Sequence, residues 1–443
     1  MDKKDKITYA AIIAILAVSL GVLWFLIIDA VNSGIANDDM PAINSDSSSI
    51  SYSAVKEITS DEDITDGEFS STDANQNVIS ASGSLKSTLS DIAIFKTGDS
   101  NGGDSTSFYG INSAIIARNG ANLTIKNTNI TTDATGANGV FSYGGSATTN
   151  NSSSDGTTVN ISDSTITTNK DNSGGIMTTG GGTMNAENLT ITTAGTSSAA
   201  IRSDRGGGTV AVNKGTYKTT GKGSPAIYST ANITVKNATL IATASEGAVI
   251  EGKNSISLEN VNLTDTNNTL NGQSTTYKNI FLYQSMSGDA ASGEAVFAAK
   301  DSTIITNKGD SFYVTNTTAK INLENNKIIN NDSTSNFLRI QKDSWGNSGS
   351  NGGIVTLNLA NQAATGNIVV DSISKLTMNL SDNSSYEGTI NGENTGEIEL
   401  ILDKTSSITL TGDTYIKSLT NADTTNSNIH LNGHKLYVNG TLI

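Results

Sequence analysis

Apolar and polar residues alternate in short runs along this chain, and one arrangement of them recurs nine times. In each copy two apolar residues flank a variable one and a second variable residue follows. The fifth position is Asn or Asp in nearly every copy, and another apolar residue comes three positions later. The copies are residues 123–130, 159–166, 184–191, 210–217, 233–240, 256–263, 297–304, 321–328 and 357–364. Alternation of this kind is typical of β-strands with one buried face, so each copy predicts two inward-facing strands separated by a bend.

The fifth position of the repeat marks the bend. It is Asn or Asp in eight of the nine copies and Lys in the other: Asn127, Asp163, Asn188, Lys214, Asn237, Asn260, Asp301, Asn325 and Asn361. A tight bend needs a residue that tolerates a left-handed backbone, and after Gly the residues that do so best are Asn and Asp. We expect their side chains to form an internal ladder, in which the amides of successive repeats bond to one another along the axis.

The ordinary spacing of 23 to 26 residues leaves room for a third strand in each repeat. Short apolar runs occur where that strand is expected, at residues 115–116, 140–141, 175–177, 200–201, 226–227, 248–250 and 280–282. Strands that pair in parallel with their equivalents in the next repeat build a solenoid, whose stability accrues along its axis. The sequence therefore predicts an all-β fold, a parallel β-helix with three strands per coil, over residues 54–443.

The N-terminal segment differs from the repeats. Three lysines within residues 1–6 precede an uncharged run over residues 7–28, which Asp29 ends. A helix of this run would be about 33 Å long, enough to cross a bilayer, and the basic residues before it place the N-terminus inside the cell. We expect a cytoplasmic tail, a single transmembrane signal-anchor helix, a flexible Ser-, Asp- and Asn-rich stalk over residues 29–53 and an extracellular β-helix over residues 54–443. The alternative is a signal peptide that is cleaved.

Charge and composition narrow the classes of partner and chemistry. The net charge of −15 argues against nucleic acid and against anionic membrane surfaces as partners. The absence of Cys excludes disulfides and thiolate metal sites. No His precedes His430, so no Ser/His/Asp set is present, and His430 and His434 lack a third metal ligand. We therefore expect no catalytic residues, no metal and no cofactor, and a membrane contact through the N-terminal helix.

Three repeats carry insertions, and all three leave the same edge of the third strand, between residues 141 and 159, 282 and 297, and 338 and 355. Loops on one side of a rigid solenoid commonly build its binding surface. We expect outward residues beside this edge to form an exposed column, with neighbours about 4.8 Å apart. The candidate ligand-binding residues there are Arg118, Arg202, Asp204, Arg205, Tyr228, Glu251, Lys253 and Trp345.

Such a strip is suited to a sugar or an acidic polymer, because Arg binds carboxylates with two parallel hydrogen bonds and an exposed Trp ring stacks on a sugar. The alternative is structural, since unlike charges and a ring stacked along a β-face stabilise that face. In that case Trp345 fastens its own loop to the solenoid. If the strip binds a ligand, Arg205→Ala is expected to weaken binding and to leave thermal unfolding nearly intact.

Several phrases lie between and after the repeats. They are Ser107-Phe108-Tyr109-Gly110-Ile111-Asn112, Asn138-Gly139-Val140-Phe141, Ser173-Gly174-Gly175-Ile176-Met177, Ile201-Arg202-Ser203-Asp204-Arg205-Gly206-Gly207-Gly208, Val249-Ile250-Glu251-Gly252-Lys253 and the closing Asn432-Gly433-His434-Lys435-Leu436-Tyr437-Val438-Asn439-Gly440. In them the chain resembles bacterial cell-surface adhesin-like proteins of right-handed parallel β-helix repeats. The resemblance covers roughly residues 55–443 and implies a right-handed helix and a cell-surface address, without an assigned chemistry.

More distantly, the fold is similar to that of pectate lyases, which use an acidic calcium cluster and a basic residue on one strand face, flanked by loops. This chain has the basic residues, but Asp204 and Glu251 lie two coils apart and no third carboxylate joins them. The departure argues against lyase activity and against calcium.

These observations predict a membrane-anchored extracellular β-helix that presents a binding face, for adhesion or carbohydrate binding, with a glycan or another cell surface as its partner. One alternative is a polysaccharide lyase or hydrolase that uses Arg205 and Glu251, which would release new chain ends from a polymer. Another is a purely structural component of a surface layer, which would self-associate through the ends of the helix and bind no ligand.

Overall fold

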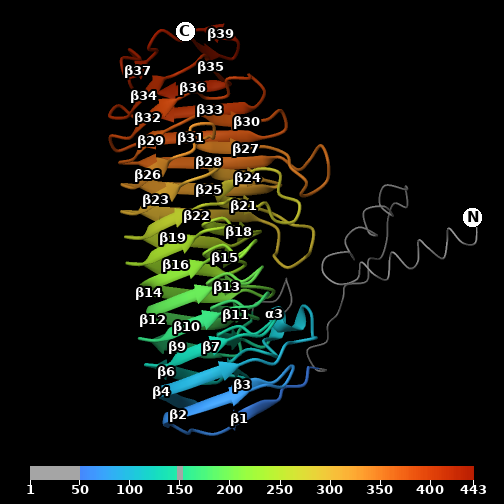
Figure 1. The fold of residues 1–443 in the computed structure, drawn as a ribbon. Coiled ribbons are helices and arrows are strands. Elements are labelled where there is room, and N and C mark those ends of the chain that lie inside the picture. Colours follow the sequence, from blue (N-terminus) through green and yellow to red (C-terminus); the bar gives the residue numbers. More distant parts are fainter. Residues whose placement is uncertain (1–49, 147–152) are drawn as a thin grey trace, which may run out of the picture. The chain divides into compact units, whose positions relative to one another are not determined.

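The computed structural model describes residues 50–146 and 153–443, which belong to one compact unit, Ile50–Ile443 (Figure 1). The expected tail and transmembrane helix, and the stalk up to residue 49, lie outside the described residues. Within the described part of the chain no helix is long and apolar enough to cross a membrane. The unit is all-β apart from α3 (Ser105–Tyr109), a short helical turn.

The first sheet contains the strand that precedes each copy of the repeat. Its strands, in spatial order, are β1 (Ala54–Ile58), β3 (Asn77–Ser82), β5 (Ile115–Arg118), β8 (Val140–Tyr143), β11 (Ile176–Thr179), β13 (Ile201–Ser203), β15 (Ile227–Ser229), β18 (Ala248–Glu251), β21 (Lys278–Tyr283), β24 (Asp310–Thr315), β27 (Leu338–Ile340) and β30 (Ile368–Val370). All neighbours are parallel. Every apolar run that was expected to form a third strand lies in this sheet.

The second sheet holds the strands on both sides of the bend. Before the bend lie β2 (Ile64–Ser71), β4 (Lys86–Lys96), β6 (Asn122–Lys126), β9 (Thr158–Ser162), β12 (Gly182–Thr193), β14 (Gly208–Thr219), β16 (Asn232–Lys236), β19 (Ser255–Glu259), β22 (Glu294–Lys300), β25 (Thr317–Glu324), β28 (Gly353–Ala360), β31 (Lys375–Ser381), β33 (Glu397–Leu402) and β36 (Ser418–Asn421). After it lie β7 (Asn129–Thr132), β10 (Thr165–Thr168), β17 (Thr239–Ala242), β20 (Asn262–Asp265), β23 (Thr303–Thr306) and β26 (Lys327–Asn330). Because β4, β12 and β14 continue through the bend and pair on both sides of it, the two columns form one 20-stranded parallel sheet.

Two small sheets complete the C-terminal part. One contains β29 (Ala363–Thr365), β32 (Ser385–Gly388), β34 (Ser407–Leu410) and β37 (Ile429–His430). The other contains β35 (Thr414–Ile416), β38 (Leu436–Val438) and β39 (Thr441–Leu442), and β39 runs antiparallel to β38. The remaining pairings are parallel, so the expectation of an all-β chain with stacked parallel strands is confirmed (Figure 1).

The bend residues adopt the backbone that the repeat predicts. All nine have positive φ, from 48° at Asn127 to 61° at Lys214. Their side chains do bond along the axis: Asn188 Nδ2 donates to Asp163 Oδ1 at 2.8 Å. However, the column is exposed, so the expectation of an internal ladder is wrong. The reason is that the fourth and fifth residues of the repeat both face outward, and the sixth residue, Thr128 in the first copy, takes the buried position.

The buried polar ladder is built from serines instead. The backbone N–H of Ala137 donates to Ser173 Oγ at 3.0 Å, that of Ser173 to Ser198 Oγ at 2.9 Å, and that of Ser198 to Ser224 Oγ at 2.8 Å. The side chains of these serines are completely buried. Each hydroxyl thus satisfies a backbone donor of the preceding coil that water does not reach.

The left-handed bend leads to a test of the repeat. Asn188→Leu is expected to lower the free energy of unfolding by about 1–2 kcal/mol, because a Leu side chain is disfavoured at a φ of 53°. The matched control is Thr190→Leu, an exposed strand position two residues later, where the change should stay within about 0.5 kcal/mol. Equal urea midpoints for Asn188→Leu and the unmodified chain would contradict the role given to the bend.

Candidate functional site

The eight candidate residues lie in the first sheet or in the turns that follow its strands, but they do not form one column. Arg202 pairs with Tyr228, whereas Glu251 pairs with Tyr283 in the next strand. Arg205 lies beyond the end of β13. The expected alignment assumed a fixed number of residues between the first sheet and the repeat. The predicted alignment is wrong because the turn from β13 to β14 is longer than the turn from β15 to β16.

The outward face of the first sheet is also covered. Its central column is Ile116, Phe141, Met177, Arg202, Tyr228, Val249, Phe281, Tyr313 and Arg339. Phe108 and Tyr109 of α3 pack on its first part, and Trp345 packs on its second part. The expectation of an exposed strip is therefore wrong for most of its length: Asp204 and Glu251 are 6% and 1% exposed. Thus α3 covers one part of this face, and the loop that carries Trp345 covers another.

Arg205 connects α3 to the insertion after β21. The Arg205 guanidinium lies 4.0 Å from the centre of the Phe108 ring in α3 and donates to Asp289 Oδ1 through Nε at 3.1 Å and Nη2 at 2.6 Å. Asp289 belongs to the insertion after β21. Arg202 Nη2 donates to Asp204 Oδ2 at 2.9 Å. Both guanidinium groups thus have carboxylate partners within the protein. These contacts favour a structural role for the strip over ligand binding.

Glu251 is held in the same way. The hydroxyls of Tyr228 and Tyr283 donate to its Oε2, the latter at 3.0 Å, and Ser285 donates to Oε1. Burial raises the pKa of Glu251, although these hydrogen bonds oppose the rise. Since Ser285 lies in the insertion after β21, the carboxylate joins that insertion to β18. Its oxygens are occupied by protein donors, so the arrangement favours a structural role.

The other three candidate residues contact different parts of the same face. The Arg118 guanidinium stacks on Tyr52, 4.2 Å from the ring centre. The Trp345 ring lies 4.8 Å from the ring of Tyr283, the arrangement expected if it fastens its own loop. Lys253 is exposed. The structure thus brings together Arg202, Asp204, Arg205, Tyr228 and Glu251. Trp345 packs against Tyr283 beside them, and Arg118 and Lys253 lie at separate points of the same face.

Asp204 makes the stability of this network depend on pH. Burial raises the pKa of Asp204 to about 6. The positive charge of Arg202 opposes this rise, and the negative charge of Asp289 adds to it. A carboxyl whose pKa is higher in the folded than in the unfolded chain stabilises the fold as it takes up a proton. Between pH 7 and pH 5 it should therefore add about 1 kcal/mol to the free energy of unfolding.

The Asp204→Asn variant has a side chain that is neutral at every pH. It should therefore lack the gain in the free energy of unfolding between pH 7 and pH 5. Urea unfolding of both proteins at pH 7 and pH 5 measures it, and the comparison cancels the other carboxyls, including Glu251. If the variant gained as much stability on acidification as the unmodified chain, Asp204 would not be the responsible group.

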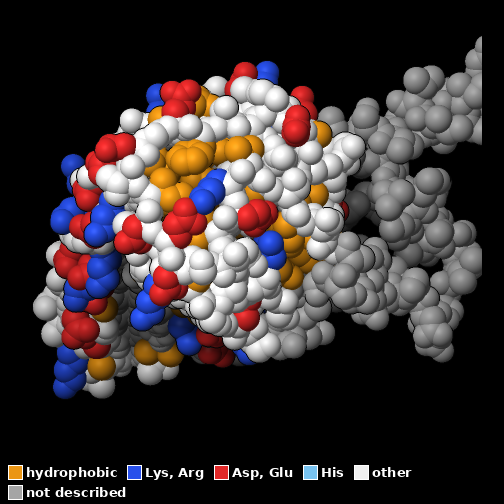
Figure 2. Space-filling view, turned by 90° about the horizontal axis from the view of Figure 1, so that it is seen from below, with side chains coloured by type: hydrophobic (Ala, Val, Ile, Leu, Met, Phe, Trp, Pro, Cys, Tyr) orange, Lys and Arg blue, Asp and Glu red, His pale blue; other side chains and the backbone are white. Residues whose placement is uncertain are grey.

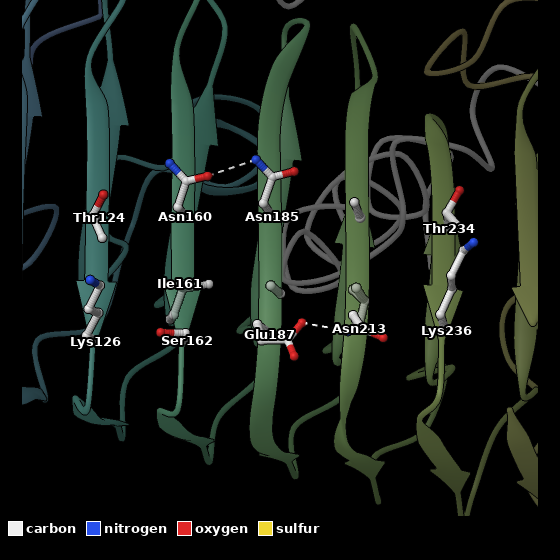
Figure 3. Close-up of a pocket in the computed structure, with 13 residues that line it drawn as sticks. Thr124, Lys126, Asn160, Ile161, Ser162, Asn185, Glu187, Asn213, Thr234 and Lys236 are labelled. Atoms are coloured by element: carbon white, nitrogen blue, oxygen red, sulfur yellow. Dashed lines mark hydrogen bonds between the residues drawn. The ribbon is translucent and has the colours of Figure 1, made fainter. Parts of the chain in front are cut away.

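A groove lies on the outer face of the second sheet, across β6, β9, β12, β14 and β16 (Figure 3). Its volume is about 380 Å³. Neighbouring strands pair in register there, so the second and fourth residues of each repeat form two outward rows. The rows are Thr124, Asn160, Asn185, Ala211 and Thr234, and Lys126, Ser162, Glu187, Asn213 and Lys236. The first and third residues of each repeat point inward and build the core beneath.

Charges of both signs line the groove. Lys126 and Lys236 lie in its outermost strands, with Glu187 between them (Figure 3). Lys236 pairs with Glu259 at 2.7 Å and Glu187 with Lys214 at 2.8 Å. The Lys214 ammonium holds the pKa of Glu187 below its usual value, so this carboxylate is charged at neutral pH. Mixed rows of acidic and basic side chains also stand out on one side of the molecule when it is viewed from the N-terminal end (Figure 2).

Asparagine amides bond to one another along one row of the groove. Asn185 Nδ2 donates to Asn160 Oδ1 at 2.9 Å, and Asn160 Nδ2 donates to Asn122 Oδ1 at 3.2 Å. Each amide thereby uses one N–H and keeps a second one for a ligand. Lys126 has no ion-pair partner among the described residues. Sequence reasoning missed this site because it treated the second and fourth residues of the repeat only as variable, although Asn160 and Asn185 recur there.

Within residues 50–146 and 153–443, no group of three or more His, Cys, Asp or Glu residues is placed to hold a metal ion. His430 lies in β37 and is exposed. The groove offers amides, hydroxyls, one ion-paired carboxylate and ammonium groups. These groups suit hydrogen bonding to a polar ligand.

Comparisons with known proteins name no family for this chain: no family model, no curated protein and no solved structure matches it. The similarity to adhesin-like β-helix proteins, and the more distant one to pectate lyases, therefore stays an expectation from the sequence.

Proposed function

We propose that this chain is a membrane-anchored cell-surface protein whose extracellular part, a right-handed parallel β-helix with three strands per coil, binds glycans in the groove across β6 to β16. The basic tail and the apolar run of residues 7–28 support the anchor, with the N-terminus inside the cell. Adhesion to another cell surface is the role that such a displayed site suits best.

The observation that carries the proposal is the row of Asn160 and Asn185 amides beside Lys126, which forms no ion pair within the part of the chain that the structure describes. A sugar ring presents neighbouring hydroxyls that both donate and accept hydrogen bonds, and an amide offers one donor and one acceptor at a matching separation. The row lies on a rigid sheet, so binding costs little ordering of the protein. Five strands at about 4.8 Å extend over roughly 19 Å, long enough for an oligosaccharide.

The test is binding of the full chain in detergent to an array of bacterial, plant and host glycans. The site variant is Asn160→Ala with Asn185→Ala. Loss of two hydrogen bonds of about 1 kcal/mol each should weaken binding roughly thirtyfold. The matched control is Asn358→Ala with Asn379→Ala, which removes a like amide pair, bonded at 2.8 Å, in β28 and β31 outside the groove.

A glycan that the control variant retains and the site variant loses would support the proposal. Equal losses in the two variants would indicate a general change in the sheet. No binding on the array would contradict glycan recognition and favour the structural surface-layer role. Shortening of a bound polymer, measured as new chain ends, would favour the enzymatic alternative.

A further inference from the structure

A buried lysine lies where the first sheet enters β21. The side chain of Lys278 is fully buried. Its Nζ donates to Ser274 Oγ at 2.9 Å and to the Thr276 carbonyl at 3.0 Å, and it lies 4.2 Å from the centre of the Phe281 ring. No water reaches this amine, which is unusual for lysine.

The carboxylate of Glu246 faces the same amine from the preceding coil. Oε1 of Glu246 lies 3.6 Å from Lys278 Nζ, and the side chain of Glu246 is 9% exposed. Ser245 Oγ donates to the other carboxylate oxygen at 2.6 Å. Asp310, the residue paired with Lys278 in β24, is bound by Arg339. Glu246 is therefore the carboxylate that Lys278 meets directly.

The surroundings favour the uncharged form of the Lys278 amine. Burial lowers the pKa of Lys278, although Glu246, Asp343 and Asp310 oppose the change. An ion pair in an apolar interior is costly, because the attraction between the charges does not fully replace their hydration. A neutral amine beside a carboxyl group is a nucleophile held next to its electrophile.

We propose that Lys278 and Glu246 condense into an intramolecular amide, a covalent link between neighbouring coils. The Nζ lone pair attacks the Glu246 carboxyl carbon, one carbon–oxygen bond breaks, and one water molecule leaves. Starting from the ammonium and the carboxylate, two of the three ammonium protons depart with that oxygen and the third stays on the amide. The step needs no oxidant, no metal and no further reactant.

The link would cross-link a chain that contains no Cys. It would close the loop from residue 246 to residue 278, which includes β18, β19 and β20. A covalent closure restricts the unfolded chain in the way that a disulfide does, and unlike a disulfide it resists reducing agents.

The test is the intact mass of the purified full chain under denaturing conditions, followed by proteolysis and fragmentation. We expect a mass one water below that of the sequence, and a branched peptide that joins the segments around residues 246 and 278. Lys278→Met and Glu246→Ala should each restore the water and the two linear peptides. Lys300→Met, at an exposed lysine that pairs with Glu324, should keep the link.

A mass equal to that of the sequence would overturn the proposal without recourse to any variant, so poor folding of a variant does not weaken the test. A missing water located elsewhere, for example as a cyclised Asp66-Gly67 pair, would overturn it as well. Glycan binding in the groove is measured independently, so either proposal can fail while the other stands.

Discussion

Phe312→Ala is expected to lower the free energy of unfolding by about 3–5 kcal/mol. The Phe312 ring is fully buried and lies in a row of interior rings that follows the axis. Its centre is 5.8 Å from that of Phe297 and 5.4 Å from that of Phe337, both edge to face. Removing the ring leaves a cavity that the neighbouring strands cannot close, because their backbone hydrogen bonds fix the distance between coils.

Urea unfolding followed by circular dichroism measures this loss. The control is Phe95→Ala, at a ring that is 40% exposed on an outer face and should contribute about 1 kcal/mol or less. Similar losses for Phe95→Ala and Phe312→Ala would show that the row of rings has no special part in the core.

Arg205→Ala is expected to cost about 2–3 kcal/mol, the second largest effect. The change leaves Asp289 without its partner and removes the guanidinium from the Phe108 ring. Breaking a buried pair costs more than breaking a surface pair, but both side chains keep about a fifth of their exposure, so the loss is smaller than at a fully buried site. This reverses the expectation from the sequence that Arg205 could be removed with little effect on melting.

A double-mutant cycle with Asp289→Ala isolates the pair. If Asp289→Ala adds little once Arg205 is gone, the two residues act through each other. Lys300→Ala, which breaks the exposed pair with Glu324, is the control and should change stability by less than about 1 kcal/mol. Losses at Arg205 as small as those at Lys300 would restore the view of Arg205 as a free ligand-binding residue.

Most of the fold could be predicted from the repeat, because the pattern of burial and the backbone conformation recur with it. Leu123 and Ile125 alternate with residues on the outer face and are fully buried, and Asn127 adopts the left-handed bend. What the repeat does not specify is which side of the bend faces water. The Asn column was expected to point inward, but Thr128 takes the inward position. The strand alternation is interrupted at the bend, because two adjacent residues, Lys126 and Asn127, both face outward.

The candidate site was harder to predict, for two physical reasons. Turns of unequal length shift the register between sheets, so Arg205 could not be aligned with Tyr228 by counting. Moreover, Phe108 and Asp289 approach Arg205 from segments far away in the chain, and no periodic signal marks such contacts. The groove, in contrast, follows the repeat itself: Asn160 and Asn185 lie in register because their strands do.

The contacts of Arg205 have a consequence for how the solenoid responds to force. A solenoid whose coils touch only their neighbours can lose them one at a time from an end. Here α3, which lies before β5, and Asp289, which lies after β21, are both bound to the turn between β13 and β14. A pull on either end would therefore meet a block of coils that must unfold together. A solenoid built in this way should unfold in one large step after many small ones.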